Sequence, residues 1–346
     1  MKQVYIIAEA GQNHNGSISM AKQLIDMVNM PIMDTLHNNE LPKINAIKFT
    51  KRDLTEELTK EAAAQPYNSP HSFGKTYGEH REKLELSYEQ HIELFHYAKD
   101  RGLDFVETLT SPKTLQLLNH IDLAFIKIAS RDLTNLQLLE EVGKSRNKVI
   151  LSSGMGGLKE IDNAVNVINK YHDNIVILHC ISQYPAEYQN LNLNSIPFMK
   201  EYYKGFTIGY SDHSIGIIAP VVAVALGAEF IEKHITLSHS LKGSDQAGSL
   251  EPDGLWRMTR DIRNMELAFG SHKKELNESV APFRTKLERS LCSNKQIKAG
   301  TKLNEEDLIM LSPGGGMTWL DKEKIMGKTA KQDIDENTTL EEAYFI

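Results

Sequence analysis

Short hydrophobic runs alternate with longer amphipathic stretches along most of the chain. Runs of this length that are rich in Val, Ile and Phe and end in small or polar residues are typical of buried parallel strands. Eight strands separated by helices predict an α/β fold of the (β/α)₈ type, a TIM barrel. The predicted strands cover residues 4–11, 46–50, 104–110, 125–130, 149–154, 175–180, 207–211 and 230–236.

The segments between the strands carry helix signals. A periodic stretch begins after Ser19, a suitable N-cap residue. A second helix is expected from Tyr88 onward and ends at Gly102, a residue type common just past a helix C-terminus. Residues 217–228 are apolar on nearly every side, which predicts a deeply buried helix, and a second subunit is one surface able to bury it.

The pattern changes after the last strand. A long helix is expected over residues 253–270 and a polar linker over 271–286. From residue 287 short β-like pieces with turn signals follow, so residues 287–346 are expected to form a small second domain beside a barrel domain of residues 1–270.

Composition narrows the class of protein. With 39 Lys+Arg against 46 Asp+Glu the net charge is −7, which argues against nucleic acid or an anionic membrane as a partner. Cys180 and Cys292 lack spacing typical of metal or redox sites, so both are expected to be reduced thiols. No signal peptide or membrane-length apolar run is found, and we expect a soluble cytoplasmic protein.

Polar residues crowd the predicted strand ends, where a TIM barrel carries its active site. Lys48 and Lys127 lie inside otherwise apolar strands, where an unpaired ammonium group is costly, so we expect an anion beside each. The polar set is Glu9, Lys48, Thr108, Lys127, Ser130, Ser152, Tyr184, Ser211, Asp212, His213, Lys233 and His234.

His213 and His234 end the seventh and eighth predicted strands, so their imidazoles can converge on one divalent cation. The alternative is a pair of hydrogen-bonded barrel histidines. With two nitrogen ligands and oxygen donors from water and substrate, a six-coordinate Mn²⁺ or Mg²⁺ fits better than a closed zinc site.

Loops at the same end add two candidates. Glu9 opens the stretch EAGQNHNG, which alone is typical of an Asx-rich turn. Beside two lysines and a histidine pair, Glu9 becomes a candidate general base or water-orienting group. Asp245 follows the eighth strand, where a carboxylate can hold sugar hydroxyls.

Residues 69–81, SPHSFGKTYGEHR, gather cationic and hydroxyl side chains in an acidic chain. They form either a solvated loop or a pocket for an anion. A phosphate dianion requires backbone N–H groups and two or three such donors. The candidate donors are His71, Ser72, Lys75, Tyr77, His80 and Arg81.

Ordered motifs across residues 9–254 resemble the sialic acid synthases, and the tail after residue 287 resembles their small antifreeze-like (SAF, β-clip) domain. The resemblance implies a domain-swapped homodimer in which each small domain caps the partner's barrel. It also implies condensation of phosphoenolpyruvate with a hexose or hexosamine aldehyde, with release of phosphate by C–O cleavage. The motifs are EAGQNHNG, IKFT, KIAS, LSSGM, LHCISQYP, IGYSDHS, EKHIT and KGSDQAGSLEPDG.

The resemblance also implies roles for single residues. His213 and His234 would bind Mn²⁺ or Mg²⁺, and Glu9 would orient the reactants or assist proton transfer. Phosphoenolpyruvate would be bound by Lys48, Thr108, Lys127, Ser130, Ser152 and Ser211. The sugar would be held by Ser182, Tyr184, Asp245 and Asp132.

Three positions depart from the family pattern. Arg131 follows KIAS where the family usually has Gly, although Asp132 keeps the carboxylate that follows it. Thr50 stands where Gln is common. Ser312 begins Ser-Pro-Gly where enzymes acting on the free sugar typically carry Arg-Pro-Gly, so that arginine contact to the sugar is missing.

The substrate is expected to be a phosphorylated sugar, because residues 66–81 closely resemble the matching segment of the animal N-acetylneuraminate 9-phosphate synthases. N-acetylmannosamine 6-phosphate and mannose 6-phosphate both remain open. The alternative is an unphosphorylated sugar, as used by N-acetylneuraminate, legionaminate or pseudaminate synthases. A metal-dependent hydrolase is disfavoured because this chain has no early H-x-H pair of metal ligands. A non-catalytic ice-binding module would leave Lys48 and Lys127 unexplained.

Overall fold

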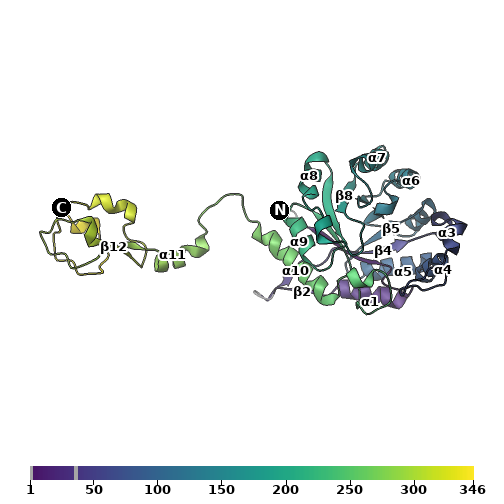
Figure 1. The fold of residues 1–346 in the computed structure, drawn as a ribbon, viewed down its shortest axis with the longest axis horizontal. Coiled ribbons are helices and arrows are strands. Elements are labelled where there is room, and N and C mark those ends of the chain that lie inside the picture. The colour runs from purple at the N-terminus through teal and green to yellow at the C-terminus, as the bar shows by residue number, and fades with distance from the viewer. Residues whose placement is uncertain (1–2, 35–37) are drawn as a thin grey trace. The chain divides into compact units, whose positions relative to one another are not determined.

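The eight predicted strands form a closed parallel barrel in the computed structural model, which describes residues 3–34 and 38–346 (Figure 1). Their order around the barrel is β1-β10-β9-β8-β7-β6-β5-β4. This confirms the predicted TIM barrel. The strands are β1 (Tyr5–Gly11), β4 (Ala46–Lys51), β5 (Asp104–Leu109), β6 (Phe125–Ile128), β7 (Val149–Ser152), β8 (Ile175–Cys180), β9 (Thr207–Asp212) and β10 (Phe230–His234).

Helices surround the barrel (Figure 1). They are α1 (Ile18–Val28), α2 (Leu54–Glu57), α3 (Lys60–Ala64), α4 (Tyr77–Leu84), α5 (Tyr88–Lys99), α6 (Leu136–Ser145), α7 (Leu158–Asn169), α8 (Ser195–Tyr202), α9 (Ile218–Ala225) and α10 (Pro252–Ala268). A short antiparallel pair, β2 (Ile32–Met33) and β3 (Glu40–Leu41), precedes β4. The 3₁₀ segments of this unit are η1 (Pro112–Asn119), η2 (Ser130–Asp132), η3 (Tyr188–Asn190) and η4 (Gln246–Gly248).

Alternation along the strands decides what faces the barrel interior. Side chains of a strand point alternately to its two faces, so on β1 Ile7 and Glu9 share the inner face while Ile6 and Ala8 face the helices. The inward-facing side chains in the first part of the strands are hydrophobic. Further along the same strands, toward their C-terminal ends, the inward-facing side chains are polar. The hydrophobic inner cluster is Ile7, Ala46, Val106, Ile150, Val176 and Leu178.

Two helix predictions need correction. Helix α1 begins after Ser17 rather than Ser19, because Ser17 has an extended backbone and its side chain accepts a hydrogen bond from the Met20 N–H. Helix α9 is not buried on every side: Ile218 and Val222, one turn apart, are 60% and 39% exposed.

One buried guanidinium ties the last helix to the first strands. Arg263 of α10 is 1% exposed and donates to the carbonyls of Val4 (2.9 Å), Pro42 (3.0 Å) and Lys43 (3.0 Å). Its partner Glu266, at 2.8 Å, also accepts from the Val4 N–H at 2.6 Å. The pair therefore satisfies backbone groups where β1 and β4 begin.

The chain divides into two units by its contacts, Met1–Gly270 and Ser271–Ile346. The second has its own core around Leu291, Leu303 and Ile325. The predicted linker is partly helical, since α11 occupies most of its second half. The elements are η5 (Glu278–Val280), α11 (Ala281–Leu287), the antiparallel pair β11 (Ser290–Ser293) and β12 (Leu308–Leu311), η6 (Glu305–Asp307), η7 (Trp319–Lys324) and η8 (Glu342–Tyr344).

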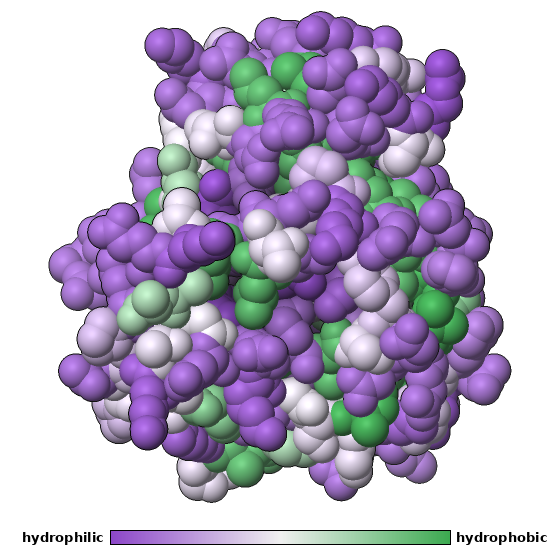
Figure 2. Space-filling model, turned by 90° about the vertical axis from the view of Figure 1, so that its right-hand side faces the viewer, coloured by the Kyte–Doolittle hydropathy of each residue, from purple (hydrophilic) through white to green (hydrophobic). Residues whose placement is uncertain are grey.

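The surface drawn in Figure 2 is mostly hydrophilic, with hydrophobic residues scattered among polar ones. Among the residues that the structure describes, no helix has both the length and the apolar character needed to cross a membrane.

We predict that Arg263→Lys lowers the free energy of unfolding by about 2–4 kcal/mol, because an ammonium group cannot reach all the carbonyls that the guanidinium satisfies. Arg260→Lys, on the same helix but paired only with Asp261 and packed on Trp256, is the matched control, with an expected change within about 0.5 kcal/mol. Urea unfolding followed by circular dichroism measures both. Equal stability of the two variants would contradict the role of Arg263.

Candidate active site

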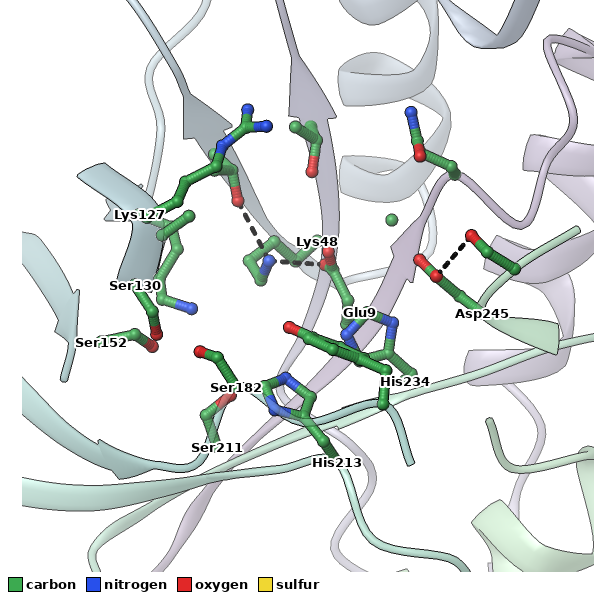
Figure 3. Close-up of a pocket in the computed structure, with 18 of the residues that line it drawn as sticks. Glu9, Lys48, Lys127, Ser130, Ser152, Ser182, Ser211, His213, His234 and Asp245 are labelled. Carbon is green, nitrogen blue, oxygen red and sulfur yellow. Dashed lines mark hydrogen bonds and ion pairs between the residues drawn. The ribbon is translucent and has the colours of Figure 1, made fainter. Parts of the chain in front are cut away.

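A cavity of about 300 Å³ opens where the barrel strands end. It collects most of the predicted site residues, which come from all eight strands or the loops just after them (Figure 3). Those on the strands and the loops just after them are Glu9, Lys48, Thr108, Lys127, Ser130, Ser152, Ser182, Tyr184, Ser211, His213, His234 and Asp245, and α4 adds Tyr77, His80 and Arg81.

The two buried lysines are paired with carboxylates of the chain itself. Lys48 Nζ lies 2.7 Å from Glu9 Oε2 and donates to Thr108 Oγ1 at 3.0 Å. Lys127 Nζ lies 2.8 Å from both carboxylate oxygens of Glu232, one of which is also 3.8 Å from Lys48 Nζ. The anions expected beside the lysines are therefore Glu9 and Glu232 in the protein without substrate.

Glu232 was not predicted as a site residue. The signal was available in the alternation, because Glu232 is two residues before His234 on β10 and therefore points to the same side of the strand. Its strand neighbour in register is Ser211 on β9, whose hydroxyl donates to Glu232 Oε1 at 3.1 Å.

The carboxyl groups of Glu9 and Glu232 differ in pKa. Burial alone would raise the pKa of Glu232, but Lys127 and Lys48 outweigh it and lower that pKa to about 2. Burial is also the largest influence on Glu9, and with the nearby Glu232 charge it raises the Glu9 pKa. Glu9 is thus the carboxyl of this pair that more readily carries a proton. Burial lowers the pKa of Lys127.

Serine hydroxyls converge beside the lysines. A Cβ atom added to Gly154 would lie 2.5 Å from Ser182 Oγ and 2.9 Å from Ser130 Oγ, so only glycine fits there. The Gly154 N–H donates to Ser130 Oγ at 3.0 Å, and the buried hydroxyls of Ser152 and Ser182 have no hydrogen-bond partner among the described residues. Figure 3 shows these hydroxyls directed toward one space. Unpaired hydroxyls beside two ammonium groups suit a phosphate or carboxylate ligand.

The two histidines meet as expected, with ring centroids 5.4 Å apart. His213 Nδ1 lies 2.8 Å from the Ile181 carbonyl and must donate to it, which leaves Nε2 as an acceptor. Burial lowers the pKa of His234, so its imidazole is neutral near pH 7, and its buried Nδ1 has no partner among the described residues. A Cβ atom added to Gly11 would lie 3.2 Å from Glu9 Oε1, so glycine at this position avoids a close contact with Glu9.

These two nitrogens fit a divalent cation that takes its other ligands from water or substrate. Within residues 3–34 and 38–346, no group of three or more His, Cys, Asp and Glu side chains is arranged to hold a metal ion. A closed structural metal site therefore does not fit this pair.

Of the four residues expected to hold the sugar, three line the cavity and Asp132 does not. The Tyr184 ring packs against His213 with centroids 4.1 Å apart and edge-on to His234 at 6.0 Å. Asp245 lines the cavity and accepts from the Ser244 hydroxyl at 2.8 Å. Asp132 does not line the cavity; its carboxylate lies 3.4 Å from the Arg131 side chain, which does.

The segment 69–81 is half in the cavity and half outside. Tyr77, His80 and Arg81 line it, because they lie three and four residues apart on one face of α4. Lys75 belongs to the N-terminus of that helix, where its N–H donates to Glu79 at 2.7 Å within a capping box. Within this segment, the predicted donors that do not line the cavity are His71, Ser72 and Lys75.

Further polar residues that were not predicted also line the cavity, among them Gln12, Thr50, Arg52 and Arg131. Arg131 had been noticed only as a departure from the family pattern. Arg52 follows β4 by one residue and had no signal beyond that position.

Comparison with known proteins places the chain in a family. The NeuB family model matches residues 39–274 and the SAF domain model matches residues 288–343. The chain belongs to the NeuB family. Members of this family are phosphoenolpyruvate-dependent enzymes of the sialic acid synthase type, and the match confirms both the suspected family and the SAF domain.

Individual relatives span nearly the whole chain. N-acetylneuraminate-9-phosphate synthase from Homo sapiens is 34% identical over 98% of this chain and 91% of its own length. N,N'-diacetyllegionaminic acid synthase from Legionella pneumophila is 33% identical over 97% and 93%. A crystal structure of N-acetylneuraminic acid synthetase from Leptospira borgpetersenii, in complex with citrate, matches with a TM-score of 0.66 and 33% identity, covering 82% of this chain and 90% of the other.

We predict that Glu232→Gln lowers the free energy of unfolding by about 3–5 kcal/mol at neutral pH, because two buried ammonium groups lose a shared counter-ion. Glu229→Gln is the control, since Glu229 just before β10 pairs with Lys200 at 3.2 Å and is partly exposed; its expected change is within about 0.5 kcal/mol.

The deficit of Glu232→Gln should shrink as the pH rises. The lowered pKa of Lys127 falls further without Glu232, so the folded variant binds fewer protons than its unfolded chain, and its stability increases with pH up to the unfolded lysine pKa. Urea unfolding of wild type and variant at neutral pH and at about pH 10 tests this. A deficit that stays constant or grows would be inconsistent with it.

Proposed function

We propose that this enzyme condenses phosphoenolpyruvate with the aldehyde of N-acetylmannosamine 6-phosphate or mannose 6-phosphate. Phosphate is released by C–O cleavage, giving a sialic acid 9-phosphate or its deaminated analogue. The observation that carries the proposal is one cavity that combines the ammonium groups of Lys48 and Lys127 with serine hydroxyls, the His213–His234 pair and Arg81 of α4.

Phosphoenolpyruvate would occupy the lysine and serine side of the cavity. Ser152 and Ser182 supply hydroxyls without other partners, and the Gly154 position leaves space above them. Lys48 and Lys127 would share their charge between the ligand and Glu9 or Glu232. Thr108, Ser130 and Ser211 complete this proposed seat.

In the reaction, C3 of phosphoenolpyruvate bonds to the aldehyde carbon of the sugar, whose oxygen needs a proton. Water then adds to C2 and loses one proton. When the C2–O bond to phosphate breaks, the new C2 hydroxyl passes its other proton to the departing phosphate and becomes the 2-keto group. Glu9, with its raised pKa and its contact to Lys48, is placed to give a proton to the sugar oxygen and to recover one from the water.

His213 and His234 would hold Mn²⁺ or Mg²⁺, which when bound supplies Lewis-acid chemistry at the aldehyde oxygen. The hydrogen bond from His213 Nδ1 to the Ile181 carbonyl orients that ring and leaves Nε2 as the nitrogen that would bind the metal. Tyr184 packs against His213 and lies edge-on to His234, and with Asp245 it would hold the sugar chain.

The assembly proposed is a homodimer in which the SAF domain of one subunit caps the barrel of the other. Its support from the chain is the exposed apolar face of α9, with Ile218 and Val222. A cytoplasmic location is proposed from the free thiols of Cys180 and Cys292.

A second candidate is an unphosphorylated sugar as acceptor. It is favoured by the legionaminic acid synthase from Legionella pneumophila, which is as similar to this chain as the human 9-phosphate synthase. Phosphate release from phosphoenolpyruvate with a panel of free hexoses, hexosamines and their 6-phosphates, with and without chelator, separates the candidates. We expect release only with the 6-phosphates and only without chelator; turnover confined to free sugars would reject the 6-phosphate proposal.

We predict that His234→Ala lowers kcat by about a hundredfold or more and removes the response to added Mn²⁺ or Mg²⁺. His239→Ala is the control, because His239 is half exposed, bonds to the Ser249 carbonyl and does not line the cavity. Steady-state phosphate release across a metal titration measures both. Near-normal turnover of His234→Ala would remove the metal role.

A further inference from the structure

Three arginines line one part of the cavity, Arg52 after β4, Arg81 on α4 and Arg131 after β6. They lie close together. With the Gln12 amide oxygen facing the arginines, that oxygen accepts from Arg52 Nη1 at 2.9 Å and from Arg81 Nη1 at 3.3 Å. Burial lowers the pKa of Arg52, and the charges of Arg81 and Arg131 lower it further.

This arginine cluster is not fully neutralised by its surroundings. Arg52 pairs with Glu85 at 3.0 Å and Arg131 with Glu57 at 2.5 Å. Arg81 bonds to the Tyr77 hydroxyl at 2.8 Å and to Gln12, and within the described part of the chain no carboxylate pairs with it.

An unsatisfied donor lies in the same cluster. The Arg52 side chain is 9% exposed, and its buried Nε–H has no hydrogen-bond partner among the described residues, although Glu57 lies 3.9 Å away. A buried guanidinium N–H left unpaired costs free energy, and an acceptor arriving in the cavity would remove that cost.

The barrel floor, by which we mean the part of the cavity formed by Lys48, Lys127, Glu9 and Glu232, has no unpaired positive charge. Lys48 and Lys127 are matched by Glu9 and Glu232. Phosphoenolpyruvate can share that floor only by competing with the chain's own carboxylates. A second dianion in the same cavity therefore needs another source of positive charge. Among the described residues that line the cavity, the arginine cluster supplies it.

We infer that Arg52, Arg81 and Arg131 form a subsite for the phosphate on the terminal carbon of the sugar. The inference rests on the proposed function. One guanidinium group can bind two oxygens of a phosphate through two parallel hydrogen bonds. Three guanidinium groups around one phosphate therefore provide both affinity and a fixed orientation. Arg131 replaces a glycine of the family pattern and Thr50, which also lines the cavity, replaces a longer glutamine, so both departures alter this part of the cavity.

Three variants test the assignment. Arg81→Gln and Arg131→Gly each remove one guanidinium, and Arg131→Gly introduces the residue usual in the family. Lys83→Ala, on the same helix as Arg81 but exposed and outside the cavity, is the control. Circular dichroism melts check that all three fold.

The first measurement is the KM for each substrate. We expect Arg81→Gln and Arg131→Gly to raise the KM for the sugar 6-phosphate about tenfold to a hundredfold while the KM for phosphoenolpyruvate stays within about twofold. Lys83→Ala should match wild type. An equal rise in the KM for phosphoenolpyruvate would overturn the inference, since the cluster would then bind that substrate's carboxylate. A larger effect from Lys75→Ala than from Arg81→Gln would also overturn it.

The second measurement is binding of mannitol 6-phosphate, which carries the phosphate but no aldehyde, by calorimetry. We expect wild type to bind it and the two arginine variants to bind it at least about tenfold more weakly. If wild type condenses only free sugars and yet binds mannitol 6-phosphate through these arginines, the proposed function fails and the subsite stands. If wild type condenses the 6-phosphates and the arginine variants bind the probe as wild type does, the function stands and the subsite fails.

Discussion

The balance of two ammonium and two carboxylate groups inside the barrel is the constraint around which the site is built. Lys48, Lys127, Glu9 and Glu232 are all nearly inaccessible to solvent, so none could remain charged there alone. Because Glu232 lies near both lysines, the pairs act as one network rather than as two separate bridges. The hydrophobic layer beneath them excludes water and strengthens every charge interaction at the floor.

This network shapes the chemistry available at the floor. Glu232 remains an anion and holds the lysines in place, whereas Glu9 has the raised pKa that suits proton transfer. The histidine pair lies beside Glu9, since His234 and Glu9 are neighbours in register on β10 and β1. Carboxyl groups, ammonium groups and imidazole nitrogens are thus brought together from adjacent strands of the barrel.

The rim of the cavity, the part lined by Arg52, Arg81 and Arg131, is built differently from the floor. Its cations come from the ends of β4 and β6 and from α4. Those after β4 and β6, Arg52 and Arg131, are paired with the partly buried Glu85 and Glu57 rather than held within the strands. The capping box at Thr76 fixes where α4 starts and so which of its residues face the cavity. Local helix geometry therefore decides which part of the segment 69–81 can meet a substrate.

The eight strands were predictable from sequence because buried parallel strands are continuous apolar runs, and the positions of Glu9, Lys48 and the histidines at the strand ends already assigned them to one face of the barrel. What only the tertiary structure decided was pairing: Glu232 beside Lys127, and Arg131 rather than Asp132 in the cavity. The reason is physical. Strand periodicity fixes the side of a strand on which a residue lies, whereas contacts between residues far apart in the chain depend on register, side-chain direction and the position of a helix start.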